Sequence, residues 1–368
     1  MAQYKVVILP GDGIGPETMR EALKVLDVVE KHSDLSFARV EAAFGAQAYF
    51  DHGHPFPDQT QALCASADAV LKGPVGLAHE EAIRIPVELQ PERGGVVPLR
   101  GLLKTFANLR PVSLPPELAH VSPLKERVTE KGLDLVMVRE LLGGLYTGSK
   151  HRGEDAEGRR YVEEMLRYDE DQIRNVVRFA FELAERRDGA LHNIHKRNIL
   201  ESSVLWNEVV EEVATEFSGV SVEHMLVDAA ATHLCLDPCQ FDVMVMENLF
   251  GDILSDQGGG ILGSLGLMPS ACIGPESAYY EPAHGSAPTI AGQGIANPYS
   301  MIGCIGLMLE YSFGQKAWGD RVFEAMREVF RSGVATSDLA ENTDALRSVG
   351  TSGFGDLVVE QLEKGGAA

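Results

Sequence analysis

Short apolar runs alternate with stretches of helical periodicity along much of this chain. The first run, residues 5–9, is continuous and leads into a glycine-rich segment. Pro16 then begins a stretch in which Met19, Leu23 and Leu26 recur at helical spacing. Continuous apolar runs of this length are typical of strands buried on both faces of a parallel sheet. The order strand, glycine loop, helix therefore predicts an α/β protein.

The same alternation continues through the middle of the chain. Further apolar runs predict buried strands at residues 69–72, 133–138, 190–194, 222–226 and 243–246. Helical periodicity predicts helices at 171–186 and 204–217. Proline-rich segments near 86–98 and 111–123 indicate loops. Together these elements favour a largely parallel sheet.

Composition and charge narrow the class of protein. The 368 residues are 45% hydrophobic and 23% charged, which suits a globular chain of two domains. The formal net charge of −22 disfavours nucleic acid and membrane surfaces as partners, because both repel a polyanion. The N-terminus lacks a signal-like pattern, and the five scattered cysteines do not form an even disulfide framework. We therefore expect a cytoplasmic location.

Two glycine-containing loops are candidate phosphate sites. The first, Gly11-x-Gly13-x-Gly15, departs from the dinucleotide-binding fingerprint Gly-x-Gly-x-x-Gly, because Pro16 stands where that pattern needs its last glycine. A standard Rossmann site is therefore not supported. The second loop, residues 281–289, has small residues that let backbone amides approach phosphates, and His284 is suited to contact an adenine.

Two aspartates in the segment Asn-Leu-Phe-Gly-Asp-Ile-Leu-Ser-Asp are candidate metal ligands. Asp252 and Asp256 are four residues apart, so a helix would place both on one face. A bound Mg²⁺ or Mn²⁺ would balance this charge, whereas the alternative is a solvated acidic face. Asp228, at the end of an apolar run, is a natural third ligand.

Three arginines in loop-like or strand-end settings are candidate carboxylate clamps. These are Arg100, Arg110 and Arg139, and ordinary salt bridges are the alternative for each. Tyr146 follows two glycines that allow close backbone approach, and its hydroxyl is a candidate acid. Lys196 follows a predicted buried strand; near a metal it would serve as a base, and otherwise it is one more exposed lysine.

Five ordered motifs carry a family resemblance over nearly the whole chain. They are Leu-Pro-Gly-Asp-Gly-Ile-Gly-Pro-Glu (9–17), Ala-Asn-Leu-Arg-Pro (107–111), Val-Arg-Glu-Leu-Leu-Gly-Gly-Leu-Tyr-Thr-Gly (138–148), Asn-Leu-Phe-Gly-Asp-Ile-Leu-Ser-Asp (248–256) and Glu-Pro-Ala-His-Gly-Ser-Ala-Pro (281–288). In these motifs the chain resembles the metal-dependent β-decarboxylating dehydrogenases, the isocitrate/isopropylmalate dehydrogenase family. The resemblance implies that family's fold, with two α/β domains around a large sheet, and not a Rossmann fold. Residues 1–105 and 263–368 would form the cofactor-binding domain, and residues 106–262 the substrate and dimerisation domain.

The resemblance also implies a role for each candidate residue. Arg100, Arg110 and Arg139 would hold the carboxylates of a small 2-hydroxy dicarboxylic acid, and Lys196 and Tyr146 would be the catalytic base and acid. Asp228, Asp252 and Asp256 would bind Mg²⁺ or Mn²⁺, with Asp228 also contacting the substrate. Because Lys196 and Asp228 reach in from the partner subunit in this family, a homodimer with shared active sites is implied.

NAD is the cofactor that the family resemblance implies. The residues expected to bind it are Ile14, Asn198, Glu281, His284, Gly285, Ser286, Ala287, Thr289 and Asn297. NAD-using members have an aspartate where this chain has Thr289, so the usual repulsion of a 2′-phosphate is missing. The chain also lacks the Lys-Tyr pair of NADP-using isocitrate enzymes at this place. We therefore expect NAD to be preferred and NADP to be tolerated.

The loop before Arg100 is the region that sets the substrate in this family. Its Pro-Glu-x-Gly pattern followed by apolar residues is similar to the isopropylmalate branch, with Glu92, Val96 and Val97 lining a pocket for an alkyl group. We therefore expect an enzyme of leucine biosynthesis acting on 3-isopropylmalate. Valines in place of the usual leucines, and His195 before the lysine, depart from that branch. Tartrate or D-malate dehydrogenase, homoisocitrate dehydrogenase and a non-catalytic regulatory subunit are the alternatives.

Overall fold

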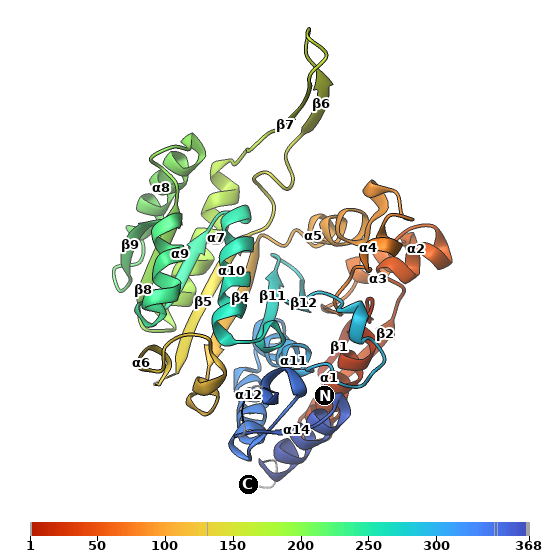
Figure 1. Cartoon of the computed structure of the whole chain (residues 1–368). Coiled ribbons are helices and arrows are strands. Elements are labelled where there is room, and N and C mark those ends of the chain that lie inside the picture. Colours follow the sequence, from red (N-terminus) through yellow and green to blue (C-terminus); the bar gives the residue numbers. More distant parts are fainter. Residues whose placement is uncertain (1, 131, 342, 344, 366–368) are drawn as a thin grey trace. The chain divides into compact units, whose positions relative to one another are not determined.

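The chain divides into two packed units in the computed structural model, which describes all residues except 1, 131, 342, 344 and 366–368 (Figure 1). The first unit comprises Met1–Thr105, Arg110–Leu133 and Gly259–Ala368, and the second comprises Phe106–Leu109 and Asp134–Gly258. This division by packing places residues 110–133 with the first unit, whereas the sequence analysis places them in the substrate domain. The assignment of functional domains stays a prediction.

The first unit is built on five strands in the order β2-β1-β3-β12-β11. Their bounds are β1 (Ala2–Leu9), β2 (Leu35–Glu41), β3 (Ala69–Lys72), β11 (Pro269–Ile273) and β12 (Ala278–Pro282). β1 pairs in parallel with both β2 and β3, and its residues Val6–Leu9 are almost completely buried. Only β11 and β12 pair antiparallel among these five. The predicted largely parallel sheet is confirmed in this unit.

Helices cover the first unit's strands. The larger ones are α1 (Gly15–Lys31), α11 (Tyr299–Tyr311), α12 (Lys316–Arg331) and α14 (Thr351–Gly365). α1 begins with Pro16 in its first turn, where the missing N–H is not needed, and it buries Met19 and Leu26. α11 is buried along Tyr299–Leu309 and packs against α1, α12 and β11. This helix forms the centre of the unit's core.

Shorter elements complete the first unit. They are α2 (Ala46–His52), α3 (Asp58–Ala65), α4 (His79–Ala82), η1 (Val87–Leu89), η2 (Pro91–Val96), α5 (Val97–Leu103), η3 (Pro116–Val121), α6 (Glu126–Thr129), η5 (Leu265–Leu267), η6 (Pro288–Ile290), β13 (Val334–Ala335), α13 (Ser337–Ala340) and β14 (Arg347–Ser348). The predicted loop near 86–98 is therefore wrong in part, since η2 and the start of α5 are helical. Pro98 stands in the first turn of α5, where a proline is tolerated.

The second unit has four parallel strands in the order β5-β10-β8-β9. They are β5 (Leu133–Glu140), β8 (Ala190–His195), β9 (Ser221–Leu226) and β10 (Val243–Met246), which confirms four predicted strands. Its helices are α7 (Glu170–Glu185), α8 (Glu201–Ala214), α9 (Val227–Leu236), η4 (Pro238–Gln240) and α10 (Asn248–Leu262). α7 and α8 match the predicted helices, and a reciprocal Asp169–Gln172 capping box begins α7.

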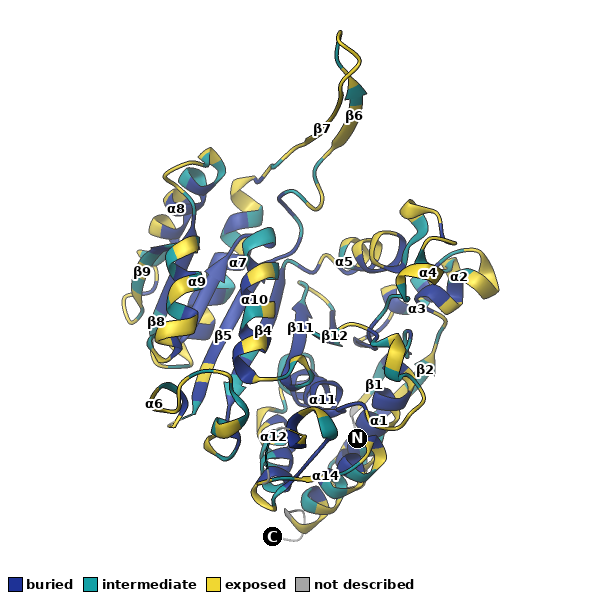
Figure 2. Cartoon of the chain, viewed as in Figure 1, coloured by how far each residue is buried: buried dark blue, intermediate teal, exposed yellow. Residues whose placement is uncertain are grey.

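Strand β4 (Ala107–Leu114) includes Pro111, so the prediction of a loop beginning there is wrong. The second unit also carries a two-stranded hairpin of β6 (Lys150–Glu154) and β7 (Arg160–Glu164), which extends away from the rest of that unit (Figure 1). Figure 2 shows the hairpin mainly exposed, while the strands of both units are mainly buried. Among the described residues, no helix is long and apolar enough to cross a membrane.

Candidate active site

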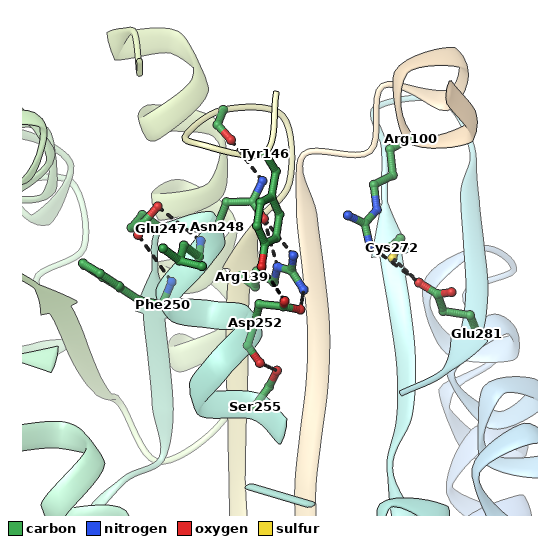
Figure 3. A network of polar contacts seen from close by, with 12 residues as sticks. Arg100, Arg139, Tyr146, Glu247, Asn248, Phe250, Asp252, Ser255, Cys272 and Glu281 are labelled. Carbon is green, nitrogen blue, oxygen red and sulfur yellow. Dashed lines mark hydrogen bonds and ion pairs between the residues drawn. The ribbon is translucent and has the colours of Figure 1, made fainter. Parts of the chain in front are cut away.

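Arg139, Tyr146, Asn248 and Asp252 form one polar cluster in the second unit, called here the Arg139 cluster (Figure 3). Arg139 lies near the end of β5 and is 2% exposed. Its Nε and Nη2 donate to Asn248 Oδ1 at 3.1 and 2.8 Å, and its Nη1 donates to Asp252 Oδ1. The Tyr146 hydroxyl donates to Asp252 Oδ2 at 2.7 Å. The fold thus brings together three of the predicted site residues.

Helix α10 supplies the acidic side of the Arg139 cluster. Residues Asn248–Leu262 are helical, so Asp252 and the exposed Asp256 are one turn apart on one face of α10. Gly251 makes the close approach of Arg139 possible, because a Cβ at this position would lie 2.5 Å from Arg139 Cγ. The glycine in the Asn-Leu-Phe-Gly-Asp motif therefore allows the arginine to lie directly against the helix.

Two buried glutamates lie behind the Arg139 cluster. Glu140 accepts hydrogen bonds from the backbone N–H groups of Leu142 and Gly143, and burial together with the charge of Glu247 raises the pKa of Glu140 to about 7. The Tyr168 hydroxyl donates to Glu247 at 2.8 Å and accepts the Asn248 backbone N–H. Burial also raises the pKa of Glu247. These groups fix the start of α10, and the sequence analysis missed them.

Lys196 and Asp228 form a separate pair in the second unit. The Lys196 ammonium lies 2.7 Å from Asp228 Oδ1, and this hydrogen bond lowers the pKa of Asp228. Asp228 was predicted at a strand end, but it lies in the first turn of α9, because β9 ends at Leu226. Asn198 is exposed in the turn between β8 and α8. His195 is buried, and burial, with the charges of His224 and Arg197, lowers its pKa to about 4.

Within the described residues, no three Asp, Glu, His or Cys side chains gather closely enough to hold a metal ion. Asp228 lies with Lys196, whereas Asp252 and Asp256 lie on α10. The proposed ligands are all carboxylates, and oxygen donors of this kind suit Mg²⁺ and Mn²⁺. The donor chemistry therefore fits the predicted metal.

Arg100 belongs to a second polar cluster, in the first unit, formed with Lys72, Tyr279 and Glu281 and called here the Arg100 cluster (Figure 3 shows Arg100 and Glu281). Arg100 was expected in a loop but lies in α5, and its Nε donates to the Tyr279 hydroxyl at 3.0 Å. The Lys72 ammonium lies 2.6 Å from Glu281 Oε2, and Arg100 Nη2 lies 4.0 Å from Glu281 Oε1. Lys72 was not predicted.

Charge balance decides the ionisation of Glu281. Burial alone would raise its pKa, but the charges of Lys72 and Arg100 and the hydrogen bond from Lys72 outweigh burial and lower the pKa to about 2. Glu281 is therefore a carboxylate at neutral pH. Arg110, the remaining predicted arginine, is 7% exposed within β4.

The two predicted phosphate loops meet in the first unit. The Ile14 backbone N–H donates to the Ser286 carbonyl at 2.8 Å, and Ser286 Oγ donates to the Gly76 carbonyl at 2.8 Å. Asp12, another group that the sequence analysis missed, accepts the backbone N–H groups of Ala46, Gln47 and Gly76. These bonds hold both loops against the start of α2.

The second loop, which begins at Glu281, presents exposed or unpaired groups beside this junction. Gly285 is exposed, and Ala287 takes a left-handed backbone conformation (φ 39°) that is uncommon for a residue other than glycine. Thr289 is exposed in η6. His284 Nδ1 contacts the Gly285 carbonyl, while its buried Nε2 has no partner among the described residues. A buried ring nitrogen left unpaired is suited to bind a ligand.

Asn297 lies in the same unit but is already engaged. Its Oδ1 accepts the Tyr299 backbone N–H at 3.0 Å, and its Nδ2 donates to Asp338 at 3.1 Å. Both ends of this amide therefore hold the start of α11 and the segment carrying Asp338. A role in binding the cofactor stays a prediction.

The two α/β units, with largely parallel strands and polar clusters at the ends of β5 and β12, define an α/β protein with arginines and carboxylates gathered at its candidate sites. Residues 5–358 match the isocitrate/isopropylmalate dehydrogenase family. The chain belongs to this family, and the predicted family and fold are confirmed.

Named relatives are similar over nearly the full length. The chain is 45% identical over 360 residues to a 3-isopropylmalate dehydrogenase of Thermotoga maritima, covering 98% of this chain and 99% of the relative. It is 43% identical over 362 residues to a 3-isopropylmalate dehydrogenase of Aliivibrio fischeri, covering 98% of each. The crystal structure of isocitrate dehydrogenase from Methylococcus capsulatus is similar at a TM-score of 0.83 and 33% identity, covering 98% of this chain and 99% of that one.

Proposed function

We propose that this protein is an NAD-dependent 3-isopropylmalate dehydrogenase of leucine biosynthesis. It would oxidise (2R,3S)-3-isopropylmalate, release CO2 and form 4-methyl-2-oxopentanoate. The observation that carries the proposal is the direct contact of Arg139, Tyr146 and Asp252 in a chain 45% identical to a 3-isopropylmalate dehydrogenase. A carboxylate clamp, a proton donor and a metal ligand side by side are the groups that oxidative decarboxylation of a hydroxy acid needs.

The arginines and the acid–base residues have distinct tasks in this proposal. Arg100, Arg110 and Arg139 bind the two substrate carboxylates through charge-assisted hydrogen bonds. Lys196 helps to remove the proton from the C2 hydroxyl while hydride leaves C2, and Asp228 holds its side chain through the 2.7 Å hydrogen bond. After the C3 carboxylate leaves as CO2, Tyr146 donates its proton to C3, and Asp252 orients that hydroxyl.

Mg²⁺ or Mn²⁺ fits the carboxylates proposed to bind it. Asp252 and Asp256 would hold it together with Asp228 of the partner subunit. When bound, such an ion polarises the C2 oxygen and stabilises the negative charge that develops during decarboxylation. Before it binds, Arg139 neutralises the charge of Asp252, and the hydrogen bonds from Arg139 and Tyr146 keep its carboxylate oriented.

NAD would bind the first unit, in the domain proposed to comprise residues 1–105 and 263–368. Support comes from the unpaired Nε2 of His284 and from the joined Ile14 and Ser286 loops. When bound, NAD accepts the hydride. The proposed binding residues of this unit are Ile14, Glu281, His284, Gly285, Ser286, Ala287, Thr289 and Asn297. Asn198, which belongs to the second unit, is proposed to contact the cofactor as well.

A cytoplasmic homodimer completes the proposal. The β6–β7 hairpin exposes Tyr161 and Val162, and Met165 follows it, 54% exposed. An isolated two-stranded hairpin is only marginally stable in water, so a partner is expected to cover these side chains. On α10, Ile253 is 59% exposed beside the proposed metal ligands. A second copy of the chain would cover such positions while supplying Lys196 and Asp228.

A substrate comparison tests the proposed function. Mn²⁺-dependent reduction of NAD is measured with 3-isopropylmalate, D-malate, tartrate, isocitrate and homoisocitrate. The proposal expects kcat/KM for 3-isopropylmalate to exceed the others by about a hundredfold, the order that a few buried methylenes supply. A preference for another acid would reassign the enzyme within its family. No turnover of any of them would favour the regulatory-subunit alternative.

A further inference from the structure

One turn of the first unit is wound more widely than an α-helix. Residues Pro91–Val96 form the π-helical turn η2, directly before α5. The Val97 backbone N–H donates to the Glu92 carbonyl, five residues back, where an α-helix would bond four residues back. Such turns are rare and occur frequently at functional sites.

The wide turn changes which side chains share a face. In an α-helix, Glu92 would lie above Val96, four residues on, whereas a five-residue spacing places it above Val97. The exposure agrees, because Val97 is 39% exposed and Val96 only 8%. Glu92 is exposed as well. Arg100 follows Val97 at i+3 on α5, so Glu92, Val97 and Arg100 fall on one side.

Two consecutive glycines hold the other side of this turn against the core. A Cβ at Gly94 would lie 2.9 Å from Pro55 Cγ and 3.0 Å from the Glu88 carbonyl oxygen. A Cβ at Gly95 would lie 3.2 Å from the Phe44 ring. Because larger residues do not fit here, the inner side of the turn is fixed. Val96, next in sequence, is carried into the core with it.

The Glu92 carboxylate points toward the joined phosphate loops. A Cβ built on Gly76 would lie 3.0 Å from Glu92 Oε1 and 3.7 Å from Ser286 Oγ. The same face therefore has a carboxylate near the cofactor loops, an apolar valine in the middle and, through Arg100, the Arg100 cluster. A ligand on this face would meet one valine side chain and not two.

We infer that Val97 alone, of the two valines, contacts the alkyl group of the substrate, while Val96 is a core residue. This inference rests on the proposed function for the identity of that group. It deepens the sequence prediction, which assigned both valines to the pocket. With one apolar contact, the enzyme would discriminate among malates by the size of the C3 alkyl group through Val97.

Matched substitutions of the two valines test this assignment. Val97→Ala and Val96→Ala shorten the side chains, Val96→Ile adds one methylene, and all three variants are assayed with 3-isopropylmalate, 3-methylmalate and D-malate. Val97→Ala is expected to lower the kcat/KM ratio of 3-isopropylmalate to D-malate about tenfold, the order expected for one or two lost methyl contacts. Val96→Ala is expected to lower the melting temperature and to leave this ratio within twofold. Val96→Ile keeps the comparison readable where Val96→Ala does not fold.

The outcomes separate the inference from the proposed function. A ratio that changes as much in a Val96 variant as in Val97→Ala, or in neither, overturns the inference. A wild-type enzyme that prefers isocitrate or D-malate overturns the proposed function. In that case the two valines are compared on the preferred acid against a smaller or larger analogue, and the inference still requires that only Val97 changes the ratio.

Discussion

The Arg139 and Arg100 clusters each join an arginine to a carboxylate, yet their charge balance differs. In the Arg100 cluster, two cations, Lys72 and Arg100, face the single carboxylate of Glu281. In the Arg139 cluster, one arginine faces Asp252, with Asp256 one turn further along α10. Among these named residues the first cluster has an excess of positive charge, and the second, when Asp256 is counted with it, has more carboxylates than arginines.

This difference matches two different tasks. An excess of buried positive charge favours an anionic ligand, because the ligand completes the neutralisation. An excess of carboxylates favours a cation, and Asp252 is 38% exposed, so it is accessible to one. Each cluster therefore has the charge that suits a different ligand, an anion at the Arg100 cluster and a cation at the Arg139 cluster.

The largest expected effect concerns Asp252 in the Arg139 cluster. Asp252→Asn keeps the shape of the side chain but removes the charge that faces Arg139 and the proposed metal ion. We expect kcat/KM to fall about a thousandfold and the Mn²⁺ concentration for half-maximal activity to rise. Steady-state kinetics over a Mn²⁺ titration measure both. The matched control is Asp320→Asn, in the exposed pair with Lys316, which should leave both unchanged.

Activity of Asp252→Asn within tenfold of wild type, with the same Mn²⁺ dependence, would remove Asp252 from the site. The comparison of the two clusters would then be one of structural ion pairs. The charge excess on α10 would need another explanation.

The sequence predicted part of each cluster and missed part, for a physical reason. Strands such as β1 and β10 were predictable because burial on both faces demands a continuous apolar run. The spacing of Asp252 and Asp256 indicated that a helix would place both on one face, and both lie on α10. Contacts between distant segments have no such local signal. Lys72 is buried because Glu281, 209 positions later, neutralises it.

The same limit applies to the supports of α10. Tyr168 accepts the Asn248 backbone N–H from a segment 80 residues away, and nothing in its neighbourhood indicates this. Gly251 was visible within a motif, but its reason, contact with Arg139, required the fold. Likewise, the double glycine at 94–95 was visible, whereas the π turn that separates Val96 from Val97 was not.

The next prediction concerns the contribution of the Arg100 cluster to stability. Lys72→Met leaves the buried Glu281 carboxylate without its nearest cation, and removing one partner of a buried pair costs about 3–5 kcal/mol of unfolding free energy. Urea unfolding measures this loss. The double variant Lys72→Met/Glu281→Gln should recover much of it, because the uncompensated charge is gone. Lys316→Met, in the exposed pair with Asp320, should cost at most about 1 kcal/mol.

The pH dependence of unfolding sharpens this test. The pKa of Glu281 is lowered from 4.5 to about 2, so its contribution is present above pH 4.5 and is lost as the pH falls toward 2. Without Lys72 the folded-state pKa should rise, and stability should be lost at higher pH than in wild type. If wild type and Lys72→Met lose stability over the same acidic pH range, Lys72 does not lower the pKa of Glu281.

Glu140, beside the Arg139 cluster, predicts a pH dependence of opposite sign. Because the pKa of Glu140 is raised from 4.5 to about 7, its contribution to the free energy of unfolding is full below pH 4.5 and is lost as the pH rises through 7. Glu140→Gln should therefore flatten the stability profile between pH 5 and 8. Between these pH values, the free energy of unfolding of wild type should fall by on the order of 3 kcal/mol more than that of the variant. Urea unfolding at four pH values tests this, with Glu163→Gln on the exposed β7 as control.

Parallel profiles for wild type and Glu140→Gln would contradict the buried acid as the source of the pH dependence. A flattened profile with unchanged activity would assign Glu140 to the stability of the cluster. A flattened profile with a shifted pH–activity curve would show that Glu140 also positions Arg139.

The smallest expected effect concerns the loop that begins at Glu281. There, the 2′-phosphate of NADP would add negative charge to the bound cofactor. Thr289 is exposed in η6, so a carboxylate there would repel NADP mainly through solvent. Thr289→Asp should lower the kcat/KM ratio of NADP to NAD about tenfold, with less effect at high salt. Thr289→Asn introduces a side chain of the same size as aspartate but without its charge, and it should leave the ratio near that of wild type. If both variants lower it equally, shape and not charge sets the cofactor preference, and the charge comparison does not extend to this loop.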